Sequence, residues 1–226
     1  MIVVPGQLDA PAERLLAALA AHGLSAAVTP EVLRAGDGPV TLAISAGPFV
    51  FDFAGFVAAV GRPFRVLMLS RLGAHPEAKA PALRRLWRLE EHVRGGGAPT
   101  LTLRFAPLLG PRAPLWNQLR SRPSLPSGGR QLLNPVLESD AVETIARALD
   151  GRAAWKGCHE VAGPEVWSLA ELRDLAVGTG PALRPRGWEP SLEEMAEHRP
   201  AQSGPWSAHF GIAPRRIADA LREHAA

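Results

Sequence analysis

Few residues in this sequence could do chemistry, and they are scattered. His75 and Lys79 stand four residues apart in the stretch HPEAK. A histidine can act as an acid or a base near pH 7, but Pro76 opposes a regular helix that begins at His75. The pair therefore fits either an active-site element or a surface loop, and both interpretations stay open.

Other arrangements that could support catalysis or metal binding are weaker. Cys158 lies beside His159, but neighbouring side chains on a strand point to opposite faces, so we expect Cys158 to be a small buried residue and not a nucleophile. The seven histidines show neither H-x-x-x-H nor H-E-x-x-H spacing, and a single cysteine supports no cysteine-based cluster and no disulfide within the chain. We predict no metal site, and no G-x-S-x-G hydrolase elbow is present.

The elements that must position these residues alternate between strands and helices. Short apolar runs predict strands at 2–6, 24–30, 39–47, 64–70 and 99–106, and helical periodicity predicts helices at 9–23, 49–61 and 80–97. Asp9 would cap the first helix, with Pro11 and Glu13 in its first turn. This alternation predicts right-handed crossovers and an α/β, doubly wound, mainly parallel sheet.

The character of the chain changes after Gly110. Residues 110–136 are rich in proline, glycine and serine, which predicts an ordered excursion with short elements. A helix follows at 139–151 with Ser139 or Asp140 as its cap, and Ser168 with Glu171 forms a capping box for another helix. Residues 178–204 are broken by prolines, and 213–226 predict a closing amphipathic helix. We expect 1–110 to form a core and 111–226 the remainder of one globular unit.

Composition excludes several classes of protein. The 226 residues carry a net charge of +3, but only Lys79 and Lys156 are lysines, and the arginines are spread along the chain among acidic neighbours. A nucleic-acid partner needs basic charge gathered on one face, so we expect none. No apolar run reaches the roughly 18 residues of a membrane span, and the start lacks the features of a secretory signal. We therefore expect no membrane association and a cytoplasmic location.

Several stretches, taken in order, carry a family resemblance. They are RVLMLSRLGAHPEA, a helix that ends in glycines, LTLRFAPLLGP, NPVLESDAVETIARALDG and HEVAGPEVWSLAEL. Their order over most of residues 1–176 resembles the atypical, extended branch of the short-chain dehydrogenase/reductase superfamily, near its NAD-dependent epimerase and NmrA-like groups. The resemblance implies a Rossmann-like sheet, a small C-terminal annex on the substrate side, and NAD or NADP as cofactor. It places Gly6, Ala46, Gly47, Arg104 and Pro107 against that cofactor.

The cofactor motif departs from the family pattern. The family's three glycines, spaced G-x-x-G-x-x-G, fall on Gly6, Asp9 and Ala12. Asp9 would put a negative charge where the diphosphate rests on a helix N-terminus, and two like charges about 4 Å apart cost about 1 kcal/mol in water and several in a partly closed cleft. The link between the second and third predicted strands is also shorter than the family's. We therefore expect weakened or absent dinucleotide binding.

The catalytic motif departs further. The family uses a serine at the end of the central strand, which corresponds to Ser70, and a Tyr-x-x-x-Lys pair on the next helix. Counting back from Glu90 and the glycine run, that pair falls on Ala82 and Leu86, and the whole chain contains no tyrosine. Neither side chain can move a proton.

Three functions follow as hypotheses. The first is a pseudoenzyme that binds a small ligand or a protein partner in the former active-site cleft. The alternative is an NAD(P)-dependent reductase or epimerase that uses His75 or a water molecule as its acid and base. A third is an obligate partner subunit.

Overall fold

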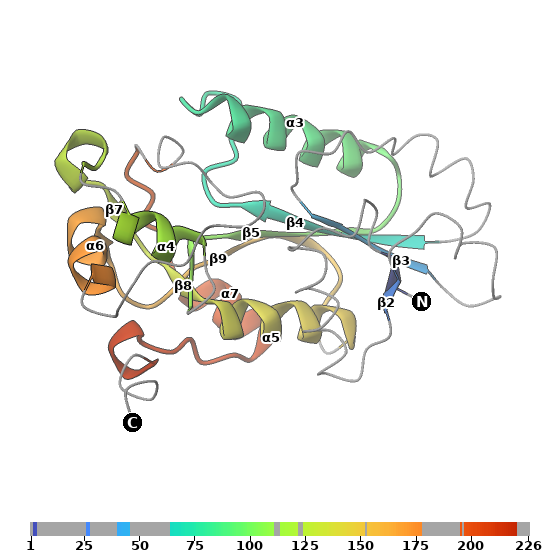
Figure 1. The fold of residues 1–226 in the computed structure, drawn as a ribbon. Helices are drawn as coiled ribbons and strands as arrows, with labels where there is room; N and C mark the ends of the chain where they lie inside the picture. Colours follow the sequence, from blue (N-terminus) through green and yellow to red (C-terminus); the bar gives the residue numbers. More distant parts are fainter. Residues whose placement is uncertain are drawn as a thin grey trace.

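A six-stranded parallel sheet forms the centre of the computed structural model, which describes residues 2–3, 26–27, 40–45, 64–110, 114–121, 124–151, 153–177, 195 and 197–220. Every neighbouring pair of strands in this sheet runs parallel (Figure 1). The order across the sheet is β2 (Ala26–Ala27), β1 (Ile2–Val3), β3 (Val40–Ser45), β4 (Phe64–Arg71), β5 (Thr100–Phe105) and β9 (Gly157–Val161). The predicted doubly wound α/β sheet is confirmed.

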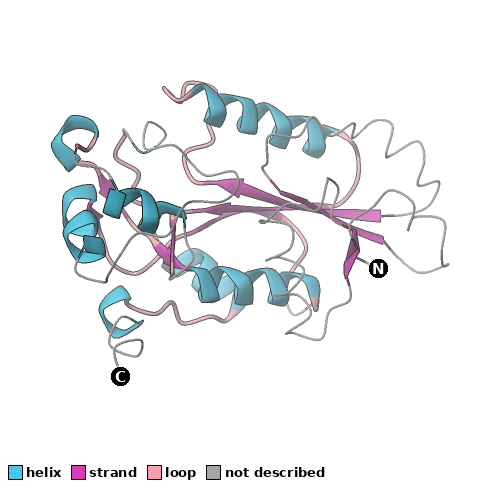
Figure 2. Cartoon of the chain, viewed as in Figure 1, coloured by secondary structure: helices cyan, strands magenta, loops and turns pink. Residues whose placement is uncertain are grey.

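Helices cover both faces of this sheet. The helix α3 (Pro81–Gly95) lies on one face, while α5 (Glu138–Leu149) and α7 (Gly204–Phe210) lie on the other (Figure 2). A strand covered on both faces has no polar side, which explains why Val66, Leu67 and Met68 in β4 are all fully buried. The continuous apolar run in residues 64–70 thus indicated that β4 lies inside the sheet.

The strand order reverses between β1 and β3. In doubly wound sheets, ligands bind at such a switch point, outside the carboxyl ends of the strands. Gly6, Asp9 and Ala12 follow β1, and Ala46 and Gly47 follow β3; all five lie outside the described residues. The same is true of the predicted helices at 9–23 and 49–61 and of the link at 28–39.

A smaller layer packs beside the carboxyl end of the sheet. Its apolar core includes Leu115, Leu119, Leu133, Leu169 and Leu172, all at most 1% exposed. The elements of this annex are β6 (Leu108–Leu109), α4 (Pro114–Ser121), the 3₁₀ turn η2 (Pro126–Gly129), β7 (Leu132–Leu133), β8 (Val136–Leu137), β10 (Trp167–Ser168) and α6 (Leu169–Val177). The prediction of short, ordered elements in this part of the chain is confirmed.

One predicted helix cap is present and another is wrong. At α6, the backbone N–H of Glu171 donates to Ser168 Oγ at 3.2 Å, and the Glu171 carboxylate accepts from the backbone N–H of Ser168 at 2.7 Å, so the capping box is confirmed. At α5, the residue in the cap position is Leu137, and it makes no side-chain cap. Asp140 cannot serve as the cap, because it lies in the first turn and its carboxylate is bound to Arg215.

The expected burial of Cys158 is also wrong. This residue is exposed because β9, its strand, is the outermost strand of the sheet beyond β5. The sequence showed that Cys158 lies on a strand but not that the strand lies at an edge. In the described part of the chain, no helix is long and apolar enough to cross a membrane.

Candidate functional site

Three polar side chains meet between the sheet and α3, near the carboxyl ends of β4 and β5. Ser70 and Arg104 are direct partners in the register of the two strands, so their side chains share one face. Glu90 reaches them from α3: Ser70 Oγ donates to Glu90 Oε1, and Arg104 Nε lies 3.1 Å from both carboxylate oxygens. Arg104 Nη2 adds a contact of 2.5 Å to Glu90 Oε2. We call these three residues the β4–α3–β5 cluster.

The β4–α3–β5 cluster is buried and internally satisfied. Glu90 is 1% exposed and Ser70 3%. Burial by itself lowers the pKa of Arg104, but the hydrogen bonds with Glu90 and the nearby acidic groups outweigh it and raise this pKa. The guanidinium therefore stays charged, and it neutralises a carboxylate that water does not reach. The Ser70 hydroxyl donates its proton to that carboxylate.

Glu90 also fixes the register of α3 against the sheet. Leu86 and Ala82 precede it by four and eight residues, so all three lie along one side of the helix. Leu86 is 6% exposed and packs into the core, and neither it nor Ala82 carries a group that can exchange a proton. These are the two positions at which the sequence comparison expected tyrosine and lysine.

The structure does not place His75 and Lys79 on one helical turn, because α3 begins only at Pro81. Both lie in the preceding loop and are exposed. His75 Nδ1 accepts the backbone N–H of Glu77 at 3.2 Å, which closes a local turn. Lys79 Nζ lies 3.9 Å from Glu197, with 83% of its side chain exposed. The surface-loop interpretation of this stretch fits the geometry.

A contact that the sequence did not reveal crosses the loop after β4. Arg199 comes from near the C-terminus, where its backbone N–H donates to the carbonyl of Leu132 in β7 at 3.0 Å. Its side chain lies over Gly73, so close that a Cβ on Gly73 would come within 2.6 Å of Arg199 Nε. Gly73 has φ +89°, a conformation that side chains rarely adopt. No local sequence signal could have paired two residues so far apart in the chain.

A depression of about 500 Å³ lies along the outer edge of β9. Strand residues form one side, and residues of the C-terminal segment form the other; the lining residues include Arg104, Cys158, Glu160, Gln202 and Trp206. Partial burial raises the pKa of the Cys158 thiol, so this cysteine is not activated as a nucleophile. Pro107, the other residue expected at the cofactor with Arg104, is half-buried just after β5.

The part of the chain that the structure describes holds no group of three or more histidine, cysteine, aspartate or glutamate side chains that could bind a metal ion. What the described residues offer instead is a buried ion pair, an exposed loop and an open strand edge.

Comparison with known proteins bears on the fold. No protein-family model matches the sequence, and no curated protein matches it. Solved structures do match. UDP-glucose 4-epimerase of Thermus thermophilus in complex with NAD has a TM-score of 0.67 and 16% identity, over 95% of this chain and 94% of that chain.

Two further solved structures are similar over nearly their whole length. A short-chain dehydrogenase/reductase superfamily protein of Agrobacterium tumefaciens with bound NAD has a TM-score of 0.68 and 16% identity, over 100% of this chain and 95% of that one. ADP-L-glycero-D-manno-heptose-6-epimerase of Helicobacter pylori has a TM-score of 0.67 and 14% identity, over 100% and 96%. The chain has the fold of the extended short-chain dehydrogenases/reductases.

The extended short-chain dehydrogenase/reductase fold was expected from the order of the motifs, and that expectation is confirmed. Two of these similar structures contain NAD. Identities of 14–16% establish the fold alone. The role of Glu90 was the main feature that sequence reasoning missed, although an acidic residue on the inward side of a helix was a usable signal.

Proposed function

We propose that this chain is a pseudoenzyme of the short-chain dehydrogenase/reductase fold, which binds a small molecule or a protein partner in the former active-site cleft. One observation carries the proposal. Counted in the sequence from Glu90, which holds α3 against β4 and β5, Ala82 and Leu86 fall where the resemblance expects the family's tyrosine and lysine. With no tyrosine anywhere in the chain, the usual proton transfer has no donor.

The state of Ser70 supports the same proposal. A catalytic serine must offer its hydroxyl to a substrate oxygen, whereas the Ser70 hydroxyl is 3% exposed and donates to Glu90. In this proposal, Ser70 at the end of β4 holds α3 in place and does not bind a substrate.

Weak dinucleotide binding is the second part of the proposal. The sequence places Asp9 where a diphosphate would rest in this fold, and its charge would repel that anion. We expect NAD and NADP to bind at least tenfold more weakly to the natural chain than to Asp9→Ser, which removes the charge and keeps a residue that can cap a helix.

Calorimetric titration of NAD(H) and NADP(H) tests this expectation. Asp174→Asn serves as a matched control, because it removes the same charge from an exposed position on α6. Tight, saturable binding by the natural protein, or equal affinities for the natural chain and Asp9→Ser, would refute weakened binding. Mass spectrometry of molecules that co-purify with the native protein would identify the ligand.

The alternative function is an NAD(P)-dependent reductase or epimerase that acts on a small metabolite. The similar structures of NAD-dependent epimerases favour it. His75 or a water molecule would then have to supply the acid and base. If purified protein carries a dinucleotide and His75→Ala abolishes a measurable turnover, the enzyme hypothesis replaces the pseudoenzyme one. A cytoplasmic location and the lack of a nucleic-acid partner stay predictions.

A further inference from the structure

Residues 197–220, which we call the C-terminal segment, lie against the rest of the fold and use histidines in two of their contacts. At the start of the segment, His198 Nδ1 accepts the backbone N–H of Leu132 in β7 at 3.2 Å. In α7, the ring of His209 stacks on the ring of His159 in β9, with centroids 4.0 Å apart and planes inclined by 30°. Phe210 packs edge-on against both rings.

The contact of His198 needs a neutral imidazole, and the stacked pair of rings cannot hold two charges without repulsion. His198 Nδ1 can accept a hydrogen bond only without a proton, so protonation there would set a donor against a donor. His159 Nε2 lies 3.2 Å from the carbonyl of Lys156, and His209 Nε2 lies 3.1 Å from the carbonyl of Ala154. Because carbonyls only accept, both Nε2 atoms carry a proton, so protonation of either ring adds the second proton at Nδ1 and places a charge beside the other ring.

The surroundings of the stacked pair disfavour charge. Burial lowers the pKa of His159, and the neighbouring His209 lowers it further. The charged group packed on this side is Arg147 of α5, which binds the carbonyl of Phe210 and is held in turn by Glu143. No carboxylate among the described residues bonds to either ring. The hydrogen bond with the Lys156 carbonyl favours the charged form of His159, but burial and His209 outweigh it, and a proton on one ring would oppose a proton on the other.

The other titratable groups near these histidines do not favour the protonated rings. Glu160 and Cys158 flank His159 in β9, where alternation turns their side chains to the opposite face. Beside His198, Glu197 already accepts from Arg199 at 3.3 Å. It also lies near Lys79 of the β4–α3 loop.

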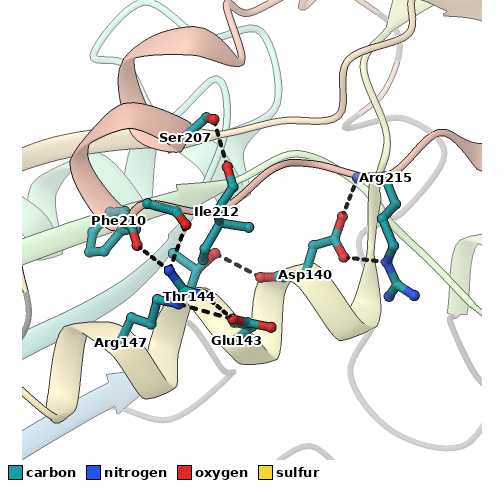
Figure 3. A network of polar contacts seen from close by, with 9 residues as sticks. Asp140, Glu143, Thr144, Arg147, Ser207, Phe210, Ile212 and Arg215 are labelled. Atoms are coloured by element: carbon teal, nitrogen blue, oxygen red, sulfur yellow. Dashed lines mark hydrogen bonds and ion pairs between the residues drawn. The ribbon is translucent and has the colours of Figure 1, made fainter.

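The far end of the segment is held by contacts that do not depend on histidine (Figure 3). Arg147 Nη1 donates to the carbonyls of Phe210 and Gly211 at 2.9 and 2.6 Å. Asp140 accepts the backbone N–H and the Nε of Arg215, both at 2.9 Å. Arginine and aspartate side chains keep their charges throughout the range in which histidines titrate.

We propose that His159, His198 and His209 form an acid-sensitive latch, which releases residues 197–209 from β7 and β9 while residues 210–217 stay attached to α5. Release withdraws Arg199 from Gly73 and so uncovers the loop after β4. It also removes one wall of the depression beside Cys158 and Glu160. The latch does not depend on whether the cleft binds a nucleotide.

Hydrogen exchange and NMR of the full chain test the latch. Trp206 of α7 is fully buried and its indole N–H donates to the carbonyl of Ala162 at 2.9 Å, so its indole signal, assigned with Trp206→Phe, reports on attachment. Between pH 7.5 and 5.5, we expect the protection of this N–H and of the α7 amides, corrected for intrinsic rates, to fall at least tenfold. The amides of α5 should change less than twofold.

Variants distinguish release caused by these three histidines from a general loss of stability in acid. The triple variant His159→Gln, His198→Asn and His209→Gln keeps the hydrogen-bonding atoms at comparable reach but cannot titrate, so its α7 protection should change less than twofold. His92→Gln, at an exposed position on α3, should respond as the natural chain does. A response that persists in the triple variant, no response in the natural chain, or equal loss of protection in α5 would overturn the proposal.

A second measurement covers the case in which the triple variant does not fold. The ring carbon-bound protons of His159 and His209 can be titrated by NMR in the natural chain. Their midpoints should coincide with the midpoint of α7 release, and a separation of more than about one pH unit would overturn the proposal.

Discussion

Two polar clusters join helices to the rest of this molecule, and they differ in their access to water. In the β4–α3–β5 cluster, Glu90 is 1% exposed and the Arg104 side chain 19%. In the contacts between α5 and the C-terminal segment, Arg215 is 46% exposed against an Asp140 side chain of 7%, and Glu143 is 42% exposed against an Arg147 side chain of 28%. Both clusters pair arginine with a carboxylate, but each pair of the second cluster has one partner that is more than two-fifths exposed to water.

This difference assigns the two clusters different tasks. A buried carboxylate that loses its partner keeps an uncompensated charge, so the first cluster is a permanent support of the sheet. Exposed pairs contribute little free energy because water screens them. The second cluster can therefore hold one end of a segment whose other end moves.

The largest expected effect comes from breaking the buried cluster. Glu90→Ala leaves the Arg104 guanidinium without its carboxylate, and we expect it to lower the free energy of unfolding by roughly 3–5 kcal/mol. Glu91→Ala is the matched control, since Glu91 lies next in α3, pairs with Arg94 and is 43% exposed; it should cost less than about 1 kcal/mol. Urea unfolding measures both, and equal costs would contradict the comparison.

A smaller effect tests the contact between the C-terminal segment and the loop after β4. Gly73→Ala strains a residue with φ +89° and pushes a methyl group into Arg199, so we expect a cost of about 2–3 kcal/mol. Gly97→Ala is the control that measures the cost of the backbone conformation alone. Gly97 has φ +78°, and a Cβ at this position would have no atom within 4 Å. We expect this substitution to cost about 1 kcal/mol. In an Arg199→Ala background, the cost at Gly73 should fall to that of Gly97. A cost that stays unchanged would mean that Arg199 is not the obstacle.

The exposed cluster should respond more weakly. Asp140→Asn removes the charge that holds Arg215 at two points, and we expect a loss of about 1–2 kcal/mol in thermal unfolding. Exchange protection should fall at residues 213–217 and stay unchanged in α3. Asp174→Asn, whose side chain is 68% exposed, should have no measurable effect. Loss of protection in α3 would show that the two clusters are coupled.

The smallest expected effect is at the start of α6, outside both clusters. Ser168→Ala removes the cap, at a cost of about 1 kcal/mol at pH 7. Hydrogen bonds from Ser168 lower the pKa of Glu171 in the folded protein. The stabilisation from the charged Glu171 carboxylate is therefore complete above the pKa that Glu171 has in the unfolded chain. It is lost as the pH falls through the lower pKa that Glu171 has in the folded protein. The difference in melting temperature between the natural chain and Ser168→Ala should shrink as the pH falls below 4, and the part that remains comes from the Glu171 N–H that Ser168 Oγ still accepts. A constant difference would exclude the Glu171 carboxylate from the cap.

A feature of the site was predictable from the sequence when it depends on residues that are close together in the chain. The expectation that Ala82 and Leu86 stand at the family's tyrosine and lysine positions came from their spacing to Glu90, and a helix preserves spacing. The partners of Glu90 did not follow from spacing, because Ser70 and Arg104 meet only once β4 and β5 pair in register. His159 and His209 are 50 residues apart, and their stacking likewise needed the complete fold.

The sequence by itself determined the alternation of strands and helices, the central place of β4, the span of α3 and the cap of α6. These depend on hydrophobic period and on hydrogen bonds between residues near one another in the chain. Only the tertiary structure decided that β9 is an edge that exposes Cys158, that Asp140 binds Arg215 and does not cap its helix, and that Arg199 covers Gly73. Those outcomes depend on which distant segments pack together, and a one-dimensional pattern does not specify that choice.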